Sequence, residues 1–355
     1  MNILLIVNEL RFACGVTNHI FHLSKGLLKA NKVKIWIICG GGSGLDKFKN
    51  LNIILTVDKR FLHTERNIVN YVSAIGFLVN FIKKNKIQIV HPHTHYAANI
   101  SRNASKFIKI KTIQTNHGLL QTKGILKHFS AEKYIAINEH IYNYILENKI
   151  AKSQNVKFIR CGIPIPKEFP QKDYSKIKII AASRLDFEKG LDIFINAVSK
   201  LKDEVKTKAE FYIAGEGECE SELRKLNRQK NSGIQFLGIV KDMYKLLSET
   251  HIFVYPSRSN SEGFPAVITE AGATGNLLIS SNFGGSEYVI ENNKDGLIFS
   301  QNNYTDLKNV LSMVLENYKK FIPLSLNFYK KAKKWFDLDT MINQHIELYK
   351  ECLKK

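Results

Sequence analysis

The 355-residue sequence has few cysteines, few prolines and no long hydrophobic run. Its five cysteines are scattered without CxxC spacing, which argues against a zinc knuckle and against a disulfide framework. No stretch of 18 residues is both apolar and free of charge, so no membrane-spanning helix is predicted. The opening MNILLIVNEL has a short apolar core and an early glutamate, which indicate a first β-strand rather than a signal peptide. We therefore expect a folded cytoplasmic protein.

Negative charge is scarce in the first half of the chain. Residues 1–165 hold 24 Lys and Arg against 7 Asp and Glu, whereas residues 166–355 hold 28 against 25. Such a basic surface attracts polyanions, either nucleic acid or an anionic membrane leaflet. The chain has no motif that reads nucleic acid. Residues 106–112 and 118–129 mix lysines with apolar residues, which favours peripheral contact with the inner face of the cytoplasmic membrane; a solvated basic face is the alternative.

Short β-branched runs alternate with amphipathic segments of helical length, a pattern that predicts parallel sheets covered by helices. The predicted strands are ILLIV, VKIWIIC, IQIV, KTIQT and YIAI, followed by KIIAAS, EFYIAG, IQFLG, HIFVYP and LLISS. Three prolines within residues 161–170 mark a break, which gives an N-terminal domain of residues 1–165 and a second domain of residues 166–335. Apolar residues at helical spacing predict a last helix at about 336–355.

Two cations lie on a strand-to-helix turn in the second half. In ASRLDFEKG (182–190), Arg184 and Lys189 could converge on one phosphate group, or both could be solvated loop cations. A second turn, YIAGEGE, includes Gly215, a residue type that lets the backbone approach a ligand. Ligands of open α/β sheets bind beyond the carboxyl ends of the strands, where these turns are expected.

The stretch SEGFPAVITE (261–270) combines two carboxylates with a helix start. Pro265 is suited to the first position of a helix, whose free amides would favour a diphosphate. Carboxylates repel phosphate but accept hydrogen bonds from sugar hydroxyls, which suits Glu262 and Glu270. The alternative is an acid/base pair, as in a glycoside hydrolase.

Taken in order, RLDFEKG, AGEGE, QFLG, SEGFPAVITEA and NFGGSE resemble the motifs of the retaining nucleotide-sugar glycosyltransferases of family 4. The resemblance covers about residues 175–300 strongly. It implies the GT-B fold, an α/β architecture of two facing Rossmann-like doubly wound domains, with the C-terminal helix returning to the N-terminal domain. It also implies a nucleotide diphosphate sugar as the donor substrate, with no metal and no other cofactor.

The resemblance also implies roles for single residues. Arg184 and Lys189 match the cations on the donor diphosphate, Glu270 matches the glutamate on the ribose hydroxyls, and Glu262 matches the one near the donor sugar. The other donor contacts that it implies are Gly263, Phe264 and Pro265 at the sugar hydroxyls, Gly238 beside the nucleobase, and the close-approach glycines Gly215, Gly284 and Gly285.

In the first half the motifs are looser. Gly15 stands where the family has a Gly-Gly turn, Asn138 stands where a serine is common, and His117 matches the histidine that contacts the donor sugar. The run VHPHTHYAAN suggests a metal site, because His91, His93 and His95 alternate. Pro92 and the helix-like sequence after it indicate instead that the strand ends at about Val90, which favours polar lining or core packing.

These observations predict a retaining hexosyltransferase that uses a nucleotide sugar, with UDP favoured, and a glycan or lipid-linked acceptor in cell-surface polysaccharide or lipopolysaccharide synthesis. Three alternatives remain at this point. They are a phosphorylase or nucleotide-sugar epimerase of the same architecture, a glycoside hydrolase, and a basic nucleic-acid-binding protein.

Overall fold

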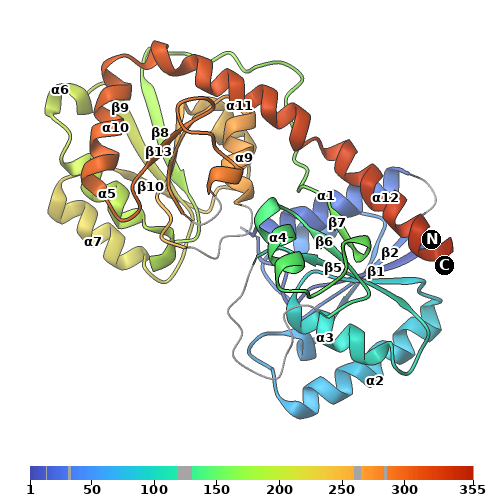
Figure 1. Ribbon diagram of the computed structural model, residues 1–355. Helices are drawn as coiled ribbons and strands as arrows, with labels where there is room; N and C mark the ends of the chain where they lie inside the picture. The colour runs from blue at the N-terminus through green and yellow to red at the C-terminus, as the bar shows by residue number, and fades with distance from the viewer. Residues whose placement is uncertain (13, 31–32, 119–129, 260–264, 284–285, 355) are drawn as a thin grey trace. The chain divides into compact units, whose positions relative to one another are not determined.

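The computed structural model describes residues 1–12, 14–30, 33–118, 130–259, 265–283 and 286–354 (Figure 1). The chain divides into two compact units, which we call unit 1 (Met1–Gly162 and Leu338–Lys355) and unit 2 (Ile163–Asp337). The junctions lie after Gly162 and Asp337, whereas the sequence predicts them after residues 165 and 335.

Unit 1 is built on a parallel sheet with the strand order β3-β2-β1-β4-β5-β6-β7. Its described strands are β1 (Asn2–Ile6), β2 (Lys34–Cys39), β3 (Ile54–Val57), β4 (Ile89–Pro92), β5 (Lys111–Asn116), β6 (Lys133–Ala136) and β7 (Val156–Phe158). Its described helices of more than one turn are α1 (Gly15–Lys29), α2 (Ile68–Asn85), α3 (His95–Ala104), α4 (Glu139–Glu147) and α12 (Leu338–Lys354).

The central strand β1 is buried on both faces. Ile3, Leu4, Leu5 and Ile6 have no exposed surface, which explains why this strand is a continuous apolar run rather than an alternating one. Each such side chain contributes about 1.5–3 kcal/mol of burial free energy. This strand is therefore the centre of the unit 1 core.

The last helix belongs to unit 1, as the resemblance predicts. It packs on α1, and a Cβ atom placed on Gly26 of α1 would lie 2.4 Å from a side-chain carbon of Ile342. The two helices therefore approach more closely than any larger residue at position 26 would allow. Met341, His345 and Tyr349 are buried at helical spacing on the same helix.

Unit 2 repeats this architecture with a parallel sheet in the order β10-β9-β8-β11-β12-β13. Its described strands are β8 (Ile177–Ala182), β9 (Ala209–Ala214), β10 (Gln235–Gly238), β11 (Ile252–Tyr255), β12 (Leu277–Ser281) and β13 (Leu297–Phe299). Its described helices are α5 (Leu191–Ser199), α6 (Asp203–Lys206), α7 (Glu220–Lys230), α8 (Met243–Glu249), α9 (Ala266–Ala273), α10 (Tyr304–Glu316) and α11 (Ile322–Trp335).

The predicted fold class is confirmed, and each of the ten predicted strands is present. Three further strands, β3, β7 and β13, were not predicted, and all three lie at the edges of the sheets. The strand order reverses between β1 and β4 in unit 1 and between β8 and β11 in unit 2. Connections diverge at such reversals, so a ligand site is expected beside the carboxyl ends of these strands.

Candidate donor and sugar sites at the carboxyl edges of the sheets

In unit 2 the predicted diphosphate cations lie on the turn that follows β8, at the reversal of strand order. Nζ of Lys189 donates a hydrogen bond to the hydroxyl of Tyr255, 3.3 Å away at the end of β11. Nη1 of Arg184 lies 3.0 Å from the carboxylate of Asp186, and half of the arginine side chain is exposed (53%). The Asp186 side chain is only 16% exposed, so a phosphate that competes for Arg184 would also leave this partly buried carboxylate without its cation.

Arg258, on the loop after β11, holds this turn in place. Its two terminal nitrogens each lie 2.7 Å from the carboxylate of Asp192 at the start of α5, and one of them also donates to the carbonyl of Phe187 at 3.0 Å. Its backbone amide donates to the carbonyl of Glu188. A bidentate arginine pair fixes orientation as well as distance, so the Lys189 turn is anchored on two sides.

The glycines near this edge differ in what surrounds them. Gly190 has φ +63°, and a Cβ atom there would lie 2.1 Å from the carbonyl oxygen of Pro256. Gly215 has φ +132°, and a Cβ atom there would lie 1.9 Å from the carbonyl oxygen of Ser183. The close approach predicted at Gly215 is therefore an approach to the protein's own backbone. Gly238 has φ +65° with open space around it, which leaves room for a ligand.

Helix α9 contains two more of the predicted residues. Pro265 is the N-cap residue, one position before the predicted helix start, because α9 begins at Ala266. Among the described residues no side chain caps the amino end of this helix. Glu270 is partly buried on α9, and its charge adds to the effect of burial in raising the pKa of Tyr244.

Five predicted donor contacts lie outside the described residues. They are Glu262, Gly263, Phe264, Gly284 and Gly285. Their roles stay predictions.

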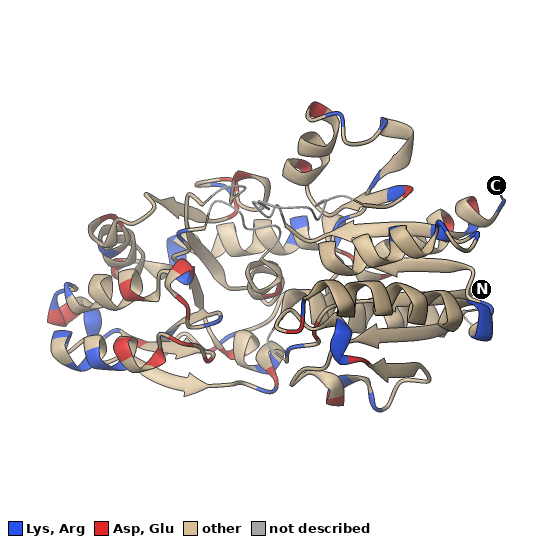
Figure 2. Ribbon diagram, turned by 90° about the horizontal axis from the view of Figure 1, so that it is seen from below, with Lys and Arg blue, Asp and Glu red and all other residues tan. Residues whose placement is uncertain are grey.

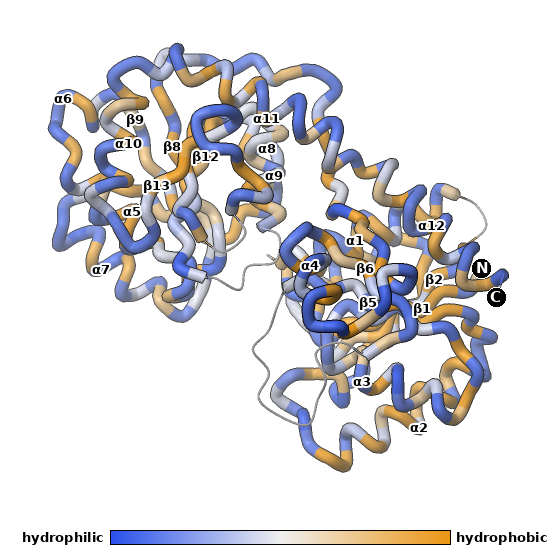
Figure 3. The backbone as a smooth tube through the Cα atoms, in the orientation of Figure 1, coloured by the Kyte–Doolittle hydropathy of each residue, from blue (hydrophilic) through white to orange (hydrophobic). Residues whose placement is uncertain are grey.

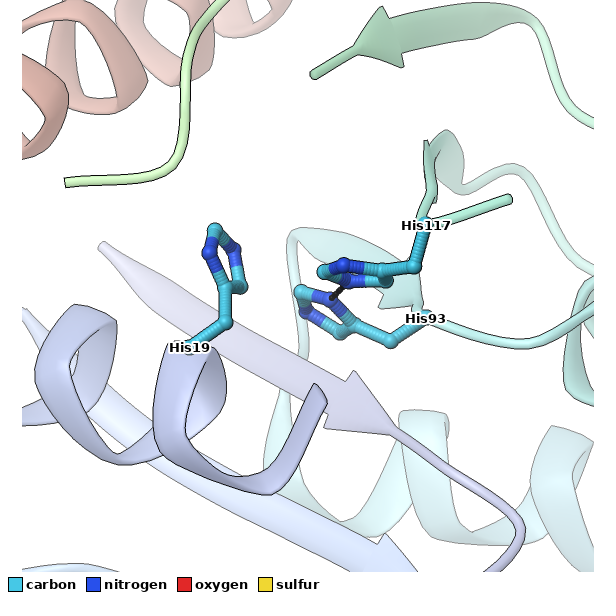
Figure 4. A group of neighbouring side chains, drawn as sticks. All are labelled: His19, His93 and His117. Carbon is cyan, nitrogen blue, oxygen red and sulfur yellow. Dashed lines mark hydrogen bonds between the residues drawn. The ribbon is translucent and has the colours of Figure 1, made fainter. Parts of the chain in front are cut away.

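In unit 1 the carboxyl edge of the sheet carries imidazoles. His117 follows β5, and its Nε2 lies 3.1 Å from Nδ1 of His93, which follows β4; one nitrogen donates the hydrogen bond that the other accepts (Figure 4). Burial, with a smaller contribution from His345, lowers the pKa of His117 to about 3. The ring is therefore neutral at physiological pH, as a partner for a sugar hydroxyl should be.

The predicted set of alternating histidines is only partly assembled. Strand β4 runs to Pro92, two residues beyond the predicted end, and His91 and His93 are both buried, with ring centroids 4.3 Å apart. His91 is satisfied by the hydroxyls of Tyr349 and Thr115, each 2.7 Å from a ring nitrogen, which is core packing of the kind that the sequence favours. His95 starts α3 and does not continue the strand.

Gly15 and Asn138 have local structural roles. Gly15 is the first residue of α1, after the N-cap residue Cys14. Asn138 is the buried N-cap of α4, and its side-chain oxygen accepts a hydrogen bond from the amide of Ile141 at 2.8 Å. Replacing such a cap by alanine costs about 0.5–2 kcal/mol, so this residue is accounted for without a ligand.

The structure also brings in residues that were not predicted for these sites. Tyr255 and Arg258 contact the Lys189 turn, while His19 of α1 and His345 of α12 lie next to the histidines of unit 1. His19 lies four residues after Gly15, so it occupies the next turn of α1. His345 reaches these histidines because α12 packs against α1, and the sequence around His345 gives no indication of this contact.

Two family profiles match the chain. Residues 165–335 match the glycosyl transferases group 1, and residues 13–166 match glycosyltransferase family 4. The two matches cover most of unit 2 and most of the N-terminal segment of unit 1.

Individual relatives act on lipid-linked sugars according to their names. The N,N'-diacetylbacillosaminyl-diphospho-undecaprenol alpha-1,3-N-acetylgalactosaminyltransferase of Campylobacter jejuni is 28% identical, with 63% of this chain and 61% of that protein covered, so this chain spans about three fifths of that relative's length. The UDP-Gal:alpha-D-GlcNAc-diphosphoundecaprenol alpha-1,3-galactosyltransferase of Escherichia coli is 24% identical, with coverages of 78% and 82%. The crystal structure of Anabaena HepE in complex with UDP-glucose matches in fold, with a TM-score of 0.81, 17% identity, and coverages of 99% and 100%.

Proposed function

Because the chain belongs to the group 1 and family 4 glycosyltransferases, we propose that it transfers a hexose-type sugar from a nucleotide diphosphate sugar, with UDP favoured, to a lipid-linked or glycan acceptor. The observation that carries the donor half of the proposal is the anchored turn with Arg184 and Lys189 at the strand reversal of unit 2. The acceptor class is suggested by the two undecaprenol-linked substrates named for the relatives.

The proposed chemistry is front-face displacement with retention of configuration. As the sugar leaves, negative charge grows on the diphosphate, and groups that bind this charge in the transition state lower the barrier. Arg184 and Lys189 supply two cations on one turn, and the amino end of α9 supplies the positive end of a helix dipole. The leaving diphosphate takes the acceptor proton, so neither a protein nucleophile nor a metal is needed.

The sugar hydroxyls require neutral or anionic partners. On the proposed pathway Glu270 binds the ribose, Glu262 binds the transferred sugar, and His117 donates to or accepts from a sugar hydroxyl. The pKa of about 3 supports the neutral role of His117. With no charge to contribute, this ring orients the sugar rather than stabilising the diphosphate.

The test is a panel of UDP-, GDP- and ADP-sugars offered to the purified chain with an undecaprenyl-diphosphate-linked sugar as acceptor. We expect release of one nucleoside diphosphate that depends on the acceptor, and a product with the donor's anomeric configuration by NMR. Release without acceptor would indicate a phosphorylase or hydrolase. Absence of both release and donor binding would contradict the proposal.

We also propose peripheral contact of unit 1 with an anionic membrane. Helix α2 exposes Ile68 (74%), Val69 (71%) and Val72 (59%), and Figure 3 shows hydrophobic segments recurring along it. Lys83 and Lys84 lie in its last turn (basic residues are blue and acidic residues red in Figure 2). A helix with exposed apolar side chains near its amino end and lysines near its carboxyl end suits the surface of an anionic bilayer.

The described helices do not include one with both the length and the hydrophobicity to cross a bilayer. The membrane proposal is tested by sedimentation with vesicles that contain phosphatidylglycerol. The double variant Ile68→Ser, Val72→Ser should bind several-fold more weakly, and high salt should weaken binding further. Equal binding by the variant would show that α2 does not make the membrane contact. The predicted segment 118–129 would then be the next candidate, and most of it lies outside the described part of the chain.

A further inference from the structure

Three histidines from separate segments of unit 1 point toward one another. His19 comes from α1, His93 follows β4 and His117 follows β5 (Figure 4). One ring nitrogen from each lies within 4.8 Å of the others. Ring centroids of His19 are 4.9 Å from His117 and 5.5 Å from His93. These segments are far apart in sequence, so the fold itself creates the cluster.

The cluster contains buried nitrogens whose hydrogen-bonding capacity is not used within the described residues. Both ring nitrogens of His19 and Nε2 of His93 have no partner there, although the two side chains are only 5% and 2% exposed. An unsatisfied buried polar atom costs about 1–3 kcal/mol. Such atoms call for an explanation, and a bound ligand at this point would supply it.

A neutral imidazole has one lone-pair nitrogen and one N–H. In the structure a nitrogen of His93 or His117 donates to a nitrogen of the other ring. A metal bound to both of these nitrogens would replace that hydrogen bond, and the donor ring would carry its proton on its other nitrogen.

We propose that His19, His93 and His117 together bind one transition-metal ion of the Zn²⁺ class. The group offers nitrogen ligands alone, which suit Zn²⁺, Co²⁺, Ni²⁺ and Cu²⁺ and disfavour Mg²⁺ and Ca²⁺. Zinc–nitrogen bonds of about 2.0–2.1 Å in a tetrahedron place ligand nitrogens about 3.3 Å apart. Nδ1 of His93 and Nε2 of His117 are already 3.1 Å apart, so the adjustments are loss of their mutual hydrogen bond and approach of the His19 ring.

The surroundings hold the ligands in position. His91 lies against His93, with its ring nitrogens fixed by Tyr349 and Thr115. His345 lies beside His19, and its Nδ1 donates a hydrogen bond to the carbonyl of Met341 at 2.8 Å, so Nδ1 carries the proton. Tyr349 and His345 come from α12, so the return of this helix completes the outer layer of the cluster.

Three protein ligands leave a fourth position open, as in zinc sites that exchange a water. This site shares His117 with the proposed transfer chemistry, which itself uses no metal. If the proposed role of His117 is correct, a bound ion occupies the ring nitrogen that would contact the sugar hydroxyl. Metal binding then inhibits transfer. This consequence rests on the proposed function, whereas the binding itself does not.

The test uses full-length protein treated with chelator and titrated with Zn²⁺ by calorimetry, and with Co²⁺ by visible spectroscopy, without donor or acceptor. We expect one ion per chain and the intense visible bands of four-coordinate Co²⁺. His19→Ala, His93→Ala and His117→Ala should each weaken binding by at least tenfold, the lower end of the range for disrupted metal shells. His63→Ala, which removes an exposed histidine, is the matched control and should leave binding unchanged.

The controls separate the alternatives. Circular dichroism verifies that each variant folds. If one of the three alanine variants does not fold, His19→Gln is used in its place to test the loss of one ligand. A thiolate charge-transfer band with Co²⁺ would place the ion on a cysteine and overturn the proposal. Unchanged affinity in the variants, or less than one ion per ten chains, would also overturn it, and neither result would bear on glycosyl transfer.

Discussion

The two units share an architecture but differ in the chemistry at the carboxyl edges of their sheets. In unit 1 this edge carries neutral imidazoles, including His93 and His117. In unit 2 the corresponding edge carries Arg184 and Lys189, on a turn anchored by Arg258. Neutral groups suit hydroxyls and cations suit a diphosphate, so the two edges are suited to different ligand groups.

The net charges of the two halves of the chain do not follow the positions of these two cations. Residues 1–165 carry the large basic surplus, whereas residues 166–355 are close to balance. A net charge describes the surface as a whole, which decides association with polyanions such as a membrane. Recognition of one diphosphate depends instead on a few cations at a strand reversal. The four predictions below test this contrast between the units.

The largest expected effect is acid lability of unit 1. Its buried cluster has folded-state pKa values below the unfolded value of about 6.5, so the folded state binds fewer protons and stability is full only above that pH. The clustered histidines with lowered pKa values are His19, His91, His93, His117 and His345. Each one that stays neutral costs about 1.4 kcal/mol of unfolding free energy per pH unit below 6.5. Residues 163–337 contain a single histidine, His251.

The two tryptophans report on the units separately. Trp36 lies in β2 of unit 1 and Trp335 ends α11 of unit 2, so Trp335→Phe and Trp36→Phe leave one reporter each. Fluorescence-detected urea unfolding of chelator-treated protein at pH 7.5 and 5.5 should show a much larger loss for unit 1. Equal losses in both units would contradict the assigned burial of the cluster.

The second prediction concerns turnover. Lys189→Ala should lower kcat by about 10²–10³-fold, the range for losing one group that stabilises developing negative charge. Lys225→Ala removes an exposed lysine of α7 in the same unit and should have no effect. The measurement is nucleoside diphosphate release at saturating donor and acceptor. If turnover of Lys189→Ala is near normal, the diphosphate is bound by other cations and the contrast between the units fails.

The third prediction concerns the neutral edge. His117→Ala should lower kcat/KM by about fivefold, since a neutral hydrogen bond is worth about 1 kcal/mol. His117→Asn keeps a neutral donor and acceptor and should recover part of the loss. Because the pKa of His117 is about 3, its ionisation should not appear in the kcat/KM profile between pH 6 and 8. Removal of a pH step in this range by His117→Asn would show that the ring is charged in the working enzyme.

The sequence predicts the central strands of each sheet and the edge strand β10, and it misses the other three edge strands. The ten predicted strands include every central one, where helices on both faces require continuous apolar runs such as Ile3–Ile6. The three missed strands are at sheet edges, where one side has no neighbour and solvent is close. In β3, for example, Ile54 is 48% exposed and Val57 is 52% exposed. Such short strands carry too weak a pattern to be distinguished from loops.

The same division holds for the sites. The sequence predicts roles for Arg184, Lys189 and His117 because each belongs to a local motif that follows a strand. Tyr255 was not, because its contact with Lys189 depends on the pairing of β8 with β11, and these strands are far apart in sequence. His19 was missed for the same reason, since its neighbours follow β4 and β5. Contacts that strand order creates cannot be obtained from motif spacing.

The smallest expected effect compares Gly238, which is predicted to lie beside the nucleobase, with Gly233, which precedes the same strand. Gly238→Ala meets no atom within 4 Å but retains φ +65°, so it should cost about 1–2 kcal/mol of stability. Gly233→Ala is the matched control, with φ +75° and only an ordinary contact with Lys206 at 3.8 Å, before β10 rather than after it. The two variants should lose similar stability. If the donor base lies against Gly238, only Gly238→Ala should raise the donor KM, by several-fold with kcat preserved, whereas equal KM values would place the base elsewhere.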